Sequence, residues 1–172
     1  MDVTDAVRSR IEVRDFADEA VEDSTKRAIL DAGRLAPSGR NLEHWRFVLV
    51  DDDDGLQALA DTSPTGGWVA GADFAVAVCT DPDYAFNEID AGRTTANMQL
   101  YAWGIGVASC LYTVDTDEAR EVLGVPEDYD LTAVLGFGVP TFDVESVEGR
   151  KDRHALSEVA SHGRFGEPLS LG

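Results

Sequence analysis

One stretch separates a helical pattern from an apolar strand, and it reads Arg34-Leu-Ala-Pro37-Ser38-Gly39-Arg40-Asn41-Leu-Glu43-His44-Trp45. Pro37 ends the helix, because proline lacks a backbone N–H and disfavours helical backbone in the residue before it. The apolar run Phe47–Val50 follows directly and predicts a strand. Residues 37–45 are therefore expected to form a loop between a helix and a strand.

This loop has the residue types that a tight, polar turn needs. Ser38 supplies a hydroxyl, Gly39 can take a positive φ, and Asn41 supplies a side-chain amide. Such a loop can direct several N–H groups at one polar edge of a ligand ring. The same residues also occur in ordinary helix-to-strand turns, so both interpretations stay open at this point.

The chain is strongly acidic. Its 172 residues include 33 Asp and Glu against 14 Lys and Arg, which gives a net charge of −19. Self-repulsion of this size needs screening, and at ~1 M salt the Debye length falls to ~3 Å. The composition predicts a protein of a salt-accumulating organism. The alternative is a merely acidic protein of an organism that does not accumulate salt. Nucleic acid is not expected as a partner, because phosphate backbones need a basic face.

Length and hydrophobic content predict one globular domain over residues 1–172, with residues 161–172 as a docking or loose tail. No apolar run approaches the ~20 residues that span a bilayer. The acidic N-terminus lacks the basic start and apolar middle of a signal peptide. We therefore expect a cytoplasmic protein that has no membrane contact.

Cysteine and histidine give no sign of a metal site or a disulfide framework. Cys79 and Cys110 each lie in an apolar, strand-like run, which predicts two buried thiols. His44, His154 and His162 show no ligand spacing with acids or cysteines. We expect no metal.

Hydrophobic periodicity predicts about five helices and four strands. Helices are expected at 2–9, 22–36, 84–103 and 116–123, and one is expected to begin within the acidic run 51–54. Strands are expected at 47–50, 73–80, 107–114 and 131–139. Asp23 or Ser24 is the expected N-cap of the second helix. Gly104-Ile-Gly106 is the expected end of the long one.

Two arginines alternate with a glutamate in the segment that follows the first helix. If this segment is extended, Arg10, Glu12 and Arg14 share one face, and Ile11 and Val13 share the other. Two guanidinium groups on one face can bind a phosphate. A surface ladder of ion pairs, with Glu12 between the two arginines, is the alternative.

A dense basic cluster occupies residues 150–156 and contains Lys151 and Arg153. Charges gathered against the overall sign of a chain favour contact with an anion. A random surface cluster is the alternative.

Four stretches, in this order, resemble the FMN-dependent nitroreductase family, and the resemblance covers residues 5–160. Residues 10–14 resemble Arg-x-Ser-x-Arg, and residues 37–45 resemble Pro-Ser-Ser-x-Asn-x-Gln-Pro-Trp. Residues 90–102 resemble Asp-x-Gly-x-x-x-x-Asn-x-x-Leu-x-Ala, which continues to a Gly-x-Gly end. Residues 151–156 resemble Lys-x-Arg-x-Pro-Leu, with alanine at the proline position.

The resemblance implies an α+β fold, in which a mixed, mainly antiparallel sheet is flanked by helices and FMN is bound at a homodimer interface. It implies an oxidoreductase that uses NAD(P)H as co-substrate, and it assigns no catalytic side chain. The residues it places at FMN are Arg10, Arg14, Lys151 and Arg153 for the phosphate, and Pro37, Ser38, Gly39 and Asn41 for the ring and ribityl chain. Glu12 stands where the family has serine, and we expect it to turn away and pair with an arginine.

The activity that the resemblance implies is transfer of hydride from NAD(P)H to electron-poor acceptors such as nitroaromatics or quinones, by a ping-pong mechanism. A specialised relative of the same fold, such as a reductive dehalogenase or a flavin-consuming enzyme, is one alternative. A flavin-binding or storage module without turnover is another.

Overall fold

The computed structural model describes residues 1–112, 114, 116–147 and 152–171. Its centre is one four-stranded sheet in the order β1-β2-β4-β3, with every neighbouring pair antiparallel. The strands are β1 Arg46–Val50, β2 Phe74–Thr80, β3 Ala108–Tyr112 and β4 Asp130–Gly138. In the described chain, one isolated parallel bridge joins Glu12 to Ser109 of β3, so this edge of the sheet has parallel as well as antiparallel pairing.

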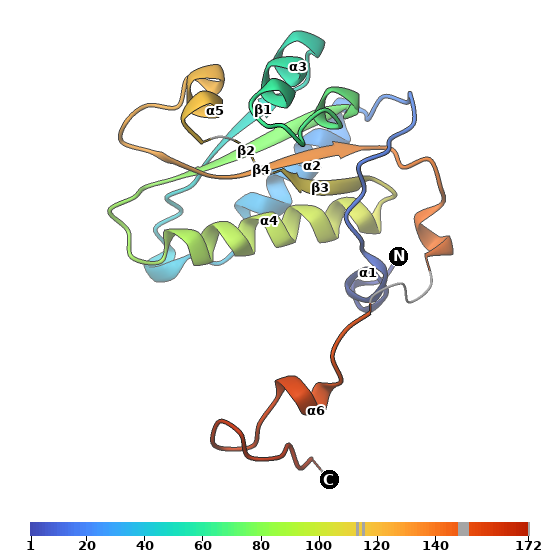
Figure 1. Cartoon of the computed structure of the whole chain (residues 1–172), viewed down its shortest axis with the longest axis vertical. Helices are drawn as coiled ribbons and strands as arrows, with labels where there is room; N and C mark the ends of the chain where they lie inside the picture. The colour runs from blue at the N-terminus through green and yellow to red at the C-terminus, as the bar shows by residue number, and fades with distance from the viewer. Residues whose placement is uncertain (113, 115, 148–151, 172) are drawn as a thin grey trace.

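Helices cover both faces of this sheet (Figure 1). They are α1 Val3–Ser9, α2 Asp23–Arg34, α3 Asp53–Asp61, α4 Asn87–Gly104, α5 Thr116–Leu123 and α6 Leu156–Val159. Helices α2 and α4 lie on one face, and α3 and α5 lie on the other. The predicted α+β fold is confirmed.

Strand β2 is buried along its whole length, and its alternate residues enter two different cores. Ala75 and Ala77 pack toward α3 and α5, whereas Phe74 and Val76 pack toward α2 and α4. This division follows from the period of two in a strand. The Phe74 ring also stacks on Phe137 of β4 with 4.8 Å between centroids. A strand covered on both faces has no polar side, which is why its sequence reads as a continuous apolar run.

The expected elements are all found, with end positions that shift by up to three residues. The N-cap prediction for α2 was wrong: the helix begins at Asp23, and Glu22 is the cap, without a side-chain hydrogen bond. The acidic run at 51–54 does begin a helix, because Asp52 accepts a hydrogen bond from the Gly55 N–H at 2.8 Å. Helix α4 ends at Gly104, and Gly106 follows with a φ of 90°. Both cysteines are free and buried, as predicted.

The C-terminal segment from residue 152 extends away from the body and ends far from it (Figure 1). It carries the short helix α6, and its large apolar side chains face solvent, including Leu156 and Phe165. Within the described part of the chain, no helix is long and apolar enough to cross a membrane.

Candidate functional site

The loop between α2 and β1 is a short 3-10 turn held by its own side chains. The Ser38 Oγ accepts a hydrogen bond from the Glu43 N–H at 3.0 Å. The Asn41 amide donates to the Glu43 carboxylate at 3.0 Å. Pro37 and Asn41 are exposed, whereas Ser38 and Gly39 are half-buried. These contacts leave the outer surface of the loop free to meet a ligand.

Three non-glycine residues of this loop have a positive φ: Arg40 at 54°, Asn41 at 55° and Glu43 at 47°. Residues that carry a side chain rarely adopt this backbone conformation, and each one that does costs about 1–3 kcal/mol of folding free energy. The surrounding structure must hold the loop in this shape. Strain of this kind gathers at ligand-binding and active sites.

Gly39 does not have the positive φ that was predicted for it, because the left-handed residues are those that follow it. The missing side chain matters for packing instead: a Cβ at this position would collide with the Tyr84 hydroxyl unless that side chain moved. The Gly39 N–H donates to the Asp90 carboxylate at 3.0 Å. The glycine therefore lets the loop pack closely on Tyr84, while its backbone N–H binds the first turn of α4.

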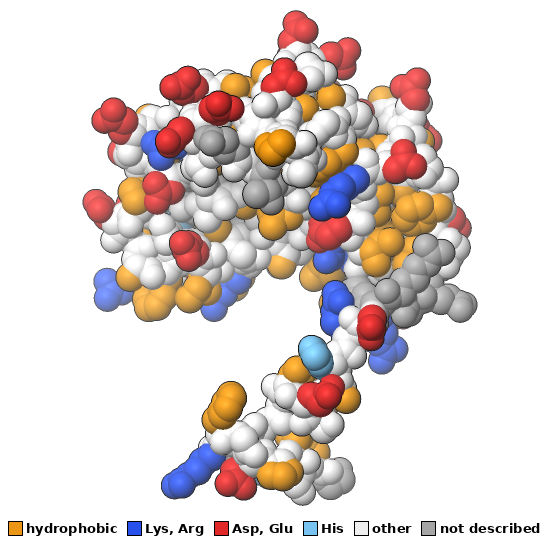
Figure 2. All heavy atoms as spheres, in the orientation of Figure 1, with side chains coloured by type: hydrophobic (Ala, Val, Ile, Leu, Met, Phe, Trp, Pro, Cys, Tyr) orange, Lys and Arg blue, Asp and Glu red, His pale blue; other side chains and the backbone are white. Residues whose placement is uncertain are grey.

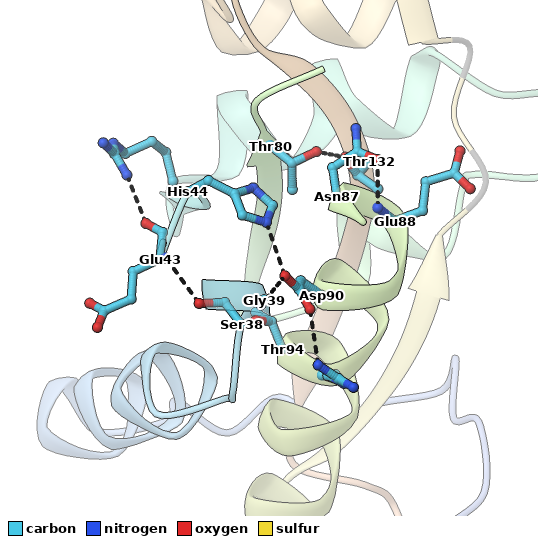
Figure 3. A network of polar contacts seen from close by, with 12 residues as sticks. Ser38, Gly39, Glu43, His44, Thr80, Asn87, Glu88, Asp90, Thr94 and Thr132 are labelled. Atoms are coloured by element: carbon cyan, nitrogen blue, oxygen red, sulfur yellow. Dashed lines mark hydrogen bonds and ion pairs between the residues drawn. The ribbon is translucent and has the colours of Figure 1, made fainter. Parts of the chain in front are cut away.

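Sequence reasoning missed the buried group beneath this loop. Asp90 is only 1% exposed, and its Oδ2 lies 3.4 Å from the His44 Nε2 as well as accepting from Gly39 (Figure 3). Its other oxygen accepts from the Arg93 guanidinium at 3.1 Å. The available signal was a carboxylate among the small residues of the long helix, with a histidine directly before Trp45.

The second half of the site lies at the β3 edge of the sheet. Glu12 pairs with the Arg10 guanidinium at 2.7 Å, so the expected arginine pairing is confirmed. The Glu12 carboxylate also accepts from the Leu111 N–H at 2.9 Å and lies 3.4 Å from the Gln99 amide. Glu12 is thus fixed against β3 and α4, and part of the positive charge of Arg10 is neutralised.

Arg14 differs from Arg10 because it forms no ion pair with a carboxylate of the described residues. Its guanidinium lies over the Trp68 ring, 6.0 Å from the centroid. It also approaches Cys110 of β3, where burial and the Glu12 carboxylate raise the pKa of the thiol although Arg14 acts to lower it. Arg14 is therefore an exposed cation whose charge is available to an anion.

The two halves contact α4 at different points. The loop contacts α4 at Asp90, whereas the arginine segment contacts α4 at Gln99, nine positions further along. At 1.5 Å per residue, these points are about 14 Å apart. The loop and the arginines therefore lie near different ends of the same helix.

The remaining predicted cations belong to the start of the C-terminal segment. Arg153 is exposed, and its guanidinium donates to the Asp152 carbonyl at 2.9 Å. Lys151 lies outside the described residues. The last described residue before it, Val147, packs in one core cluster with Ala6 of α1. Lys and Arg side chains gather where this segment leaves the body, whereas acidic side chains are scattered over the rest of the face (Figure 2).

Comparison with known proteins identifies the family. The model of the nitroreductase family matches residues 7–79 and 64–139. A relative from Archaeoglobus fulgidus, named as an NADH dehydrogenase/NAD(P)H nitroreductase, is 30% identical over 144 residues. The alignment covers 78% of this chain and 83% of that protein.

Solved structures agree with this assignment over nearly the whole chain. A nitroreductase of Desulfovibrio desulfuricans in complex with FMN is 29% identical with a TM-score of 0.81, and the match covers 96% of this chain and 98% of that one. A nitroreductase family protein of Clostridium difficile is 26% identical with a TM-score of 0.84, covering 96% and 100%. The chain belongs to the nitroreductase family.

Proposed function

We propose that the protein is an FMN-dependent oxidoreductase that passes hydride from NAD(P)H to electron-poor acceptors, such as nitroaromatics or quinones. The family membership and the FMN complex of the Desulfovibrio relative support this proposal. The single observation that carries it is that the chain holds both a strained polar loop at 38–43 and a segment at 10–14 whose Arg14 has no carboxylate partner among the described residues. A reaction that consumes NAD(P)H would belong to the cytoplasm.

The donor set of the chain fits FMN. Arg14 has no carboxylate partner in the described structure, and Arg153 is exposed, so both can meet a phosphate dianion. Lys151 lies beside Arg153 in the sequence and would add a third positive charge. Ser38 and Asn41 present a hydroxyl and an amide next to Pro37 and Gly39, a polar set that suits an isoalloxazine edge and a ribityl chain. When bound, FMN supplies the redox chemistry, while the protein binds and orients it.

We propose that the complete site forms in a homodimer, in which the loop of one subunit faces the arginines of the other. The exposed face of α4 carries Gly92 and Ala96, which permit close approach, and the apolar Ile89 and Tyr101.

The C-terminal segment fits the same assembly. Its exposed apolar side chains, such as Phe165, have no partner surface in the described part of one chain. We propose that residues 161–172 dock on the second subunit of a single-domain dimer rather than remain loose.

Anaerobic reduction of the reconstituted protein tests the proposal. Protein loaded with FMN should lose its flavin absorbance when NADH or NADPH is added and regain it when a nitroaromatic or a quinone follows. A colourless protein that takes up no FMN would contradict the cofactor assignment. A yellow protein that NAD(P)H does not bleach would instead be a flavin-binding module. If NAD(P)H bleaches the flavin but neither acceptor is reduced, the oxidoreductase assignment would stand and the proposed acceptor class would be wrong.

A further inference from the structure

The loop at residues 38–44 has a conformation that its own sequence does not favour. Arg40, Asn41 and Glu43 all have positive φ values. The hydrogen bonds within the loop join Ser38, Asn41 and Glu43 to one another, so they fix its internal shape but not its position on the body. A contact from outside the loop is needed to hold it in place.

Asp90 makes this contact from inside the protein. Its Oδ2 receives the Gly39 N–H at the start of the loop and faces the His44 Nε2 at the end of it. One carboxylate oxygen therefore binds both ends of the loop to the first turn of α4 (Figure 3). A buried carboxylate strongly requires such donors, because it has lost its water.

His44 has no other polar partner in the described structure. Its side chain is 6% exposed, and its Nδ1 is buried without a hydrogen bond. The ring packs on Tyr84 with 4.7 Å between centroids. Because a carboxylate oxygen only accepts, the Nε2 of His44 is the donor in its contact with Asp90.

The other charged group at Asp90 is placed to neutralise it. Arg93, one turn further along α4, donates to the Oδ1 at 3.1 Å while half of its side chain stays exposed. Glu88 lies on the same helix but points away from the loop (Figure 3). The carboxylate therefore keeps one oxygen for the loop and one for its counter-ion.

We propose that Asp90 is a positioning residue for the cofactor: through Gly39 and His44 it holds the 38–44 loop in its flavin-binding shape before the flavin arrives. This inference rests on the proposed FMN site, because it concerns the same loop. A loop that must first be ordered binds its ligand more weakly, in proportion to the fraction of molecules in the competent shape.

Hydrogen exchange of the FMN-free protein tests the hold on the loop directly. In Asp90→Ala, amide exchange across residues 38–44 should be at least tenfold faster than in the wild type, while β2 exchanges as before. Asp90→Asn keeps an acceptor for the Gly39 N–H and should restore most of the slow exchange. Glu88→Ala, two residues away and exposed, is the matched control and should exchange like the wild type.

FMN titration of the same variants tests the consequence. The dissociation constant should rise at least tenfold in Asp90→Ala, less in Asp90→Asn, and not in Glu88→Ala. If Asp90→Ala does not fold, His44→Phe, which removes one of the two attachments and keeps a ring, should give a smaller rise in both exchange and dissociation constant.

Two results would overturn the inference. One is wild-type exchange of the loop in a folded Asp90→Ala or, if that variant does not fold, wild-type exchange of the loop in His44→Phe. The other is faster amide exchange across residues 38–44 in Asp90→Ala with an unchanged dissociation constant for FMN. A wild-type protein whose loop exchanges slowly but which binds no FMN would instead overturn the proposed function.

Discussion

Glu12 introduces a carboxylate among the cations proposed to hold the FMN phosphate. The Glu12 carboxylate forms an ion pair with the Arg10 guanidinium at 2.7 Å. It also accepts a hydrogen bond from the Leu111 N–H, which fixes its position. Arg10 is therefore partly neutralised, and a phosphate near it would meet a negative charge. Arg14 has no such partner in the described chain. The phosphate should depend on Arg14 more than on Arg10.

Substitutions at these positions should separate the roles. Arg14→Ala or Arg153→Ala each removes a charge-assisted contact, which typically contributes ~1.5–3 kcal/mol, or roughly 10- to 150-fold in affinity. Glu12→Ser removes a repulsive charge and should leave FMN binding unchanged or tighter. Fluorescence titration of FMN measures all three. The opposite order of effects would mean that the phosphate lies elsewhere.

At the scale of single residues, the sequence predicted chemistry better than conformation. The Glu12–Arg10 pair follows from alternation in an extended segment, which is local. The positive φ was expected at Gly39 and occurs at Arg40, Asn41 and Glu43, because tertiary contacts decide it. Asp90 was missed for the same reason: its partners lie 46 and 51 positions away in the chain.

At the scale of elements, Lys26 joins three of them. This residue of α2 pairs with Asp51, just before α3, at 3.3 Å and with Asp73, just before β2, at 3.2 Å. Burial acts to lower the pKa of Lys26, but the Asp73 and Asp51 carboxylates outweigh it, and the pKa lies above its ordinary value. The pair of contacts therefore stabilises the folded state while Lys26 is charged.

The stability from Lys26 should depend on pH in one direction. Because the folded pKa is raised, the contribution is fully present below the unfolded pKa of about 10.4 and is lost as pH rises through the higher folded value. Urea unfolding of wild type and Lys26→Met should differ most at neutral pH and converge in the alkaline range. A difference that grows above pH ~10.5 would contradict this sign.

Helix α4 should be the element on which dimerisation depends. Ala96 is exposed on one chain, so Ala96→Arg should fold but prevent close approach of a second subunit. Light scattering should show a monomer that binds FMN weakly. Ala20→Arg, at an exposed position on a different segment, is the control and should remain dimeric. A folded, FMN-loaded monomer of the wild type would contradict the shared site.

The elements themselves were largely predictable, because their periodicity is local, whereas their assembly was not. Apolar runs marked β2 and β4, and apolar residues at helical spacing marked α2. The order β1-β2-β4-β3 depends on pairings between distant strands, which no local pattern contains. The N-cap prediction for α2 was wrong because Glu22, which makes no side-chain hydrogen bond to the helix, occupies the N-cap position.

At the scale of the whole molecule, the net charge of −19 should make folding depend on salt. Acidic side chains are spread over the face that Figure 2 shows, and the 33 Asp and Glu outnumber the 14 Lys and Arg, so repulsion acts across the body. We expect helical circular dichroism to be low in dilute buffer and to rise toward ~1 M KCl, where the Debye length is ~3 Å. Equal spectra at low and molar salt would contradict adaptation to a salt-rich cell.

The order in which the two substrates bind should follow from the single place that the proposed site offers them at the flavin. In the proposed dimer, NAD(P)H and the acceptor would both have to reach the flavin between the 38–43 loop of one subunit and the arginines of the other. They could not occupy that place together, so the donor would have to leave before the acceptor enters. Initial rates over a grid of donor and acceptor concentrations should give parallel double-reciprocal lines. A nitroaromatic and a quinone should also compete with each other, since one stacking surface would serve both. Intersecting lines would instead indicate a ternary complex and a separate acceptor site.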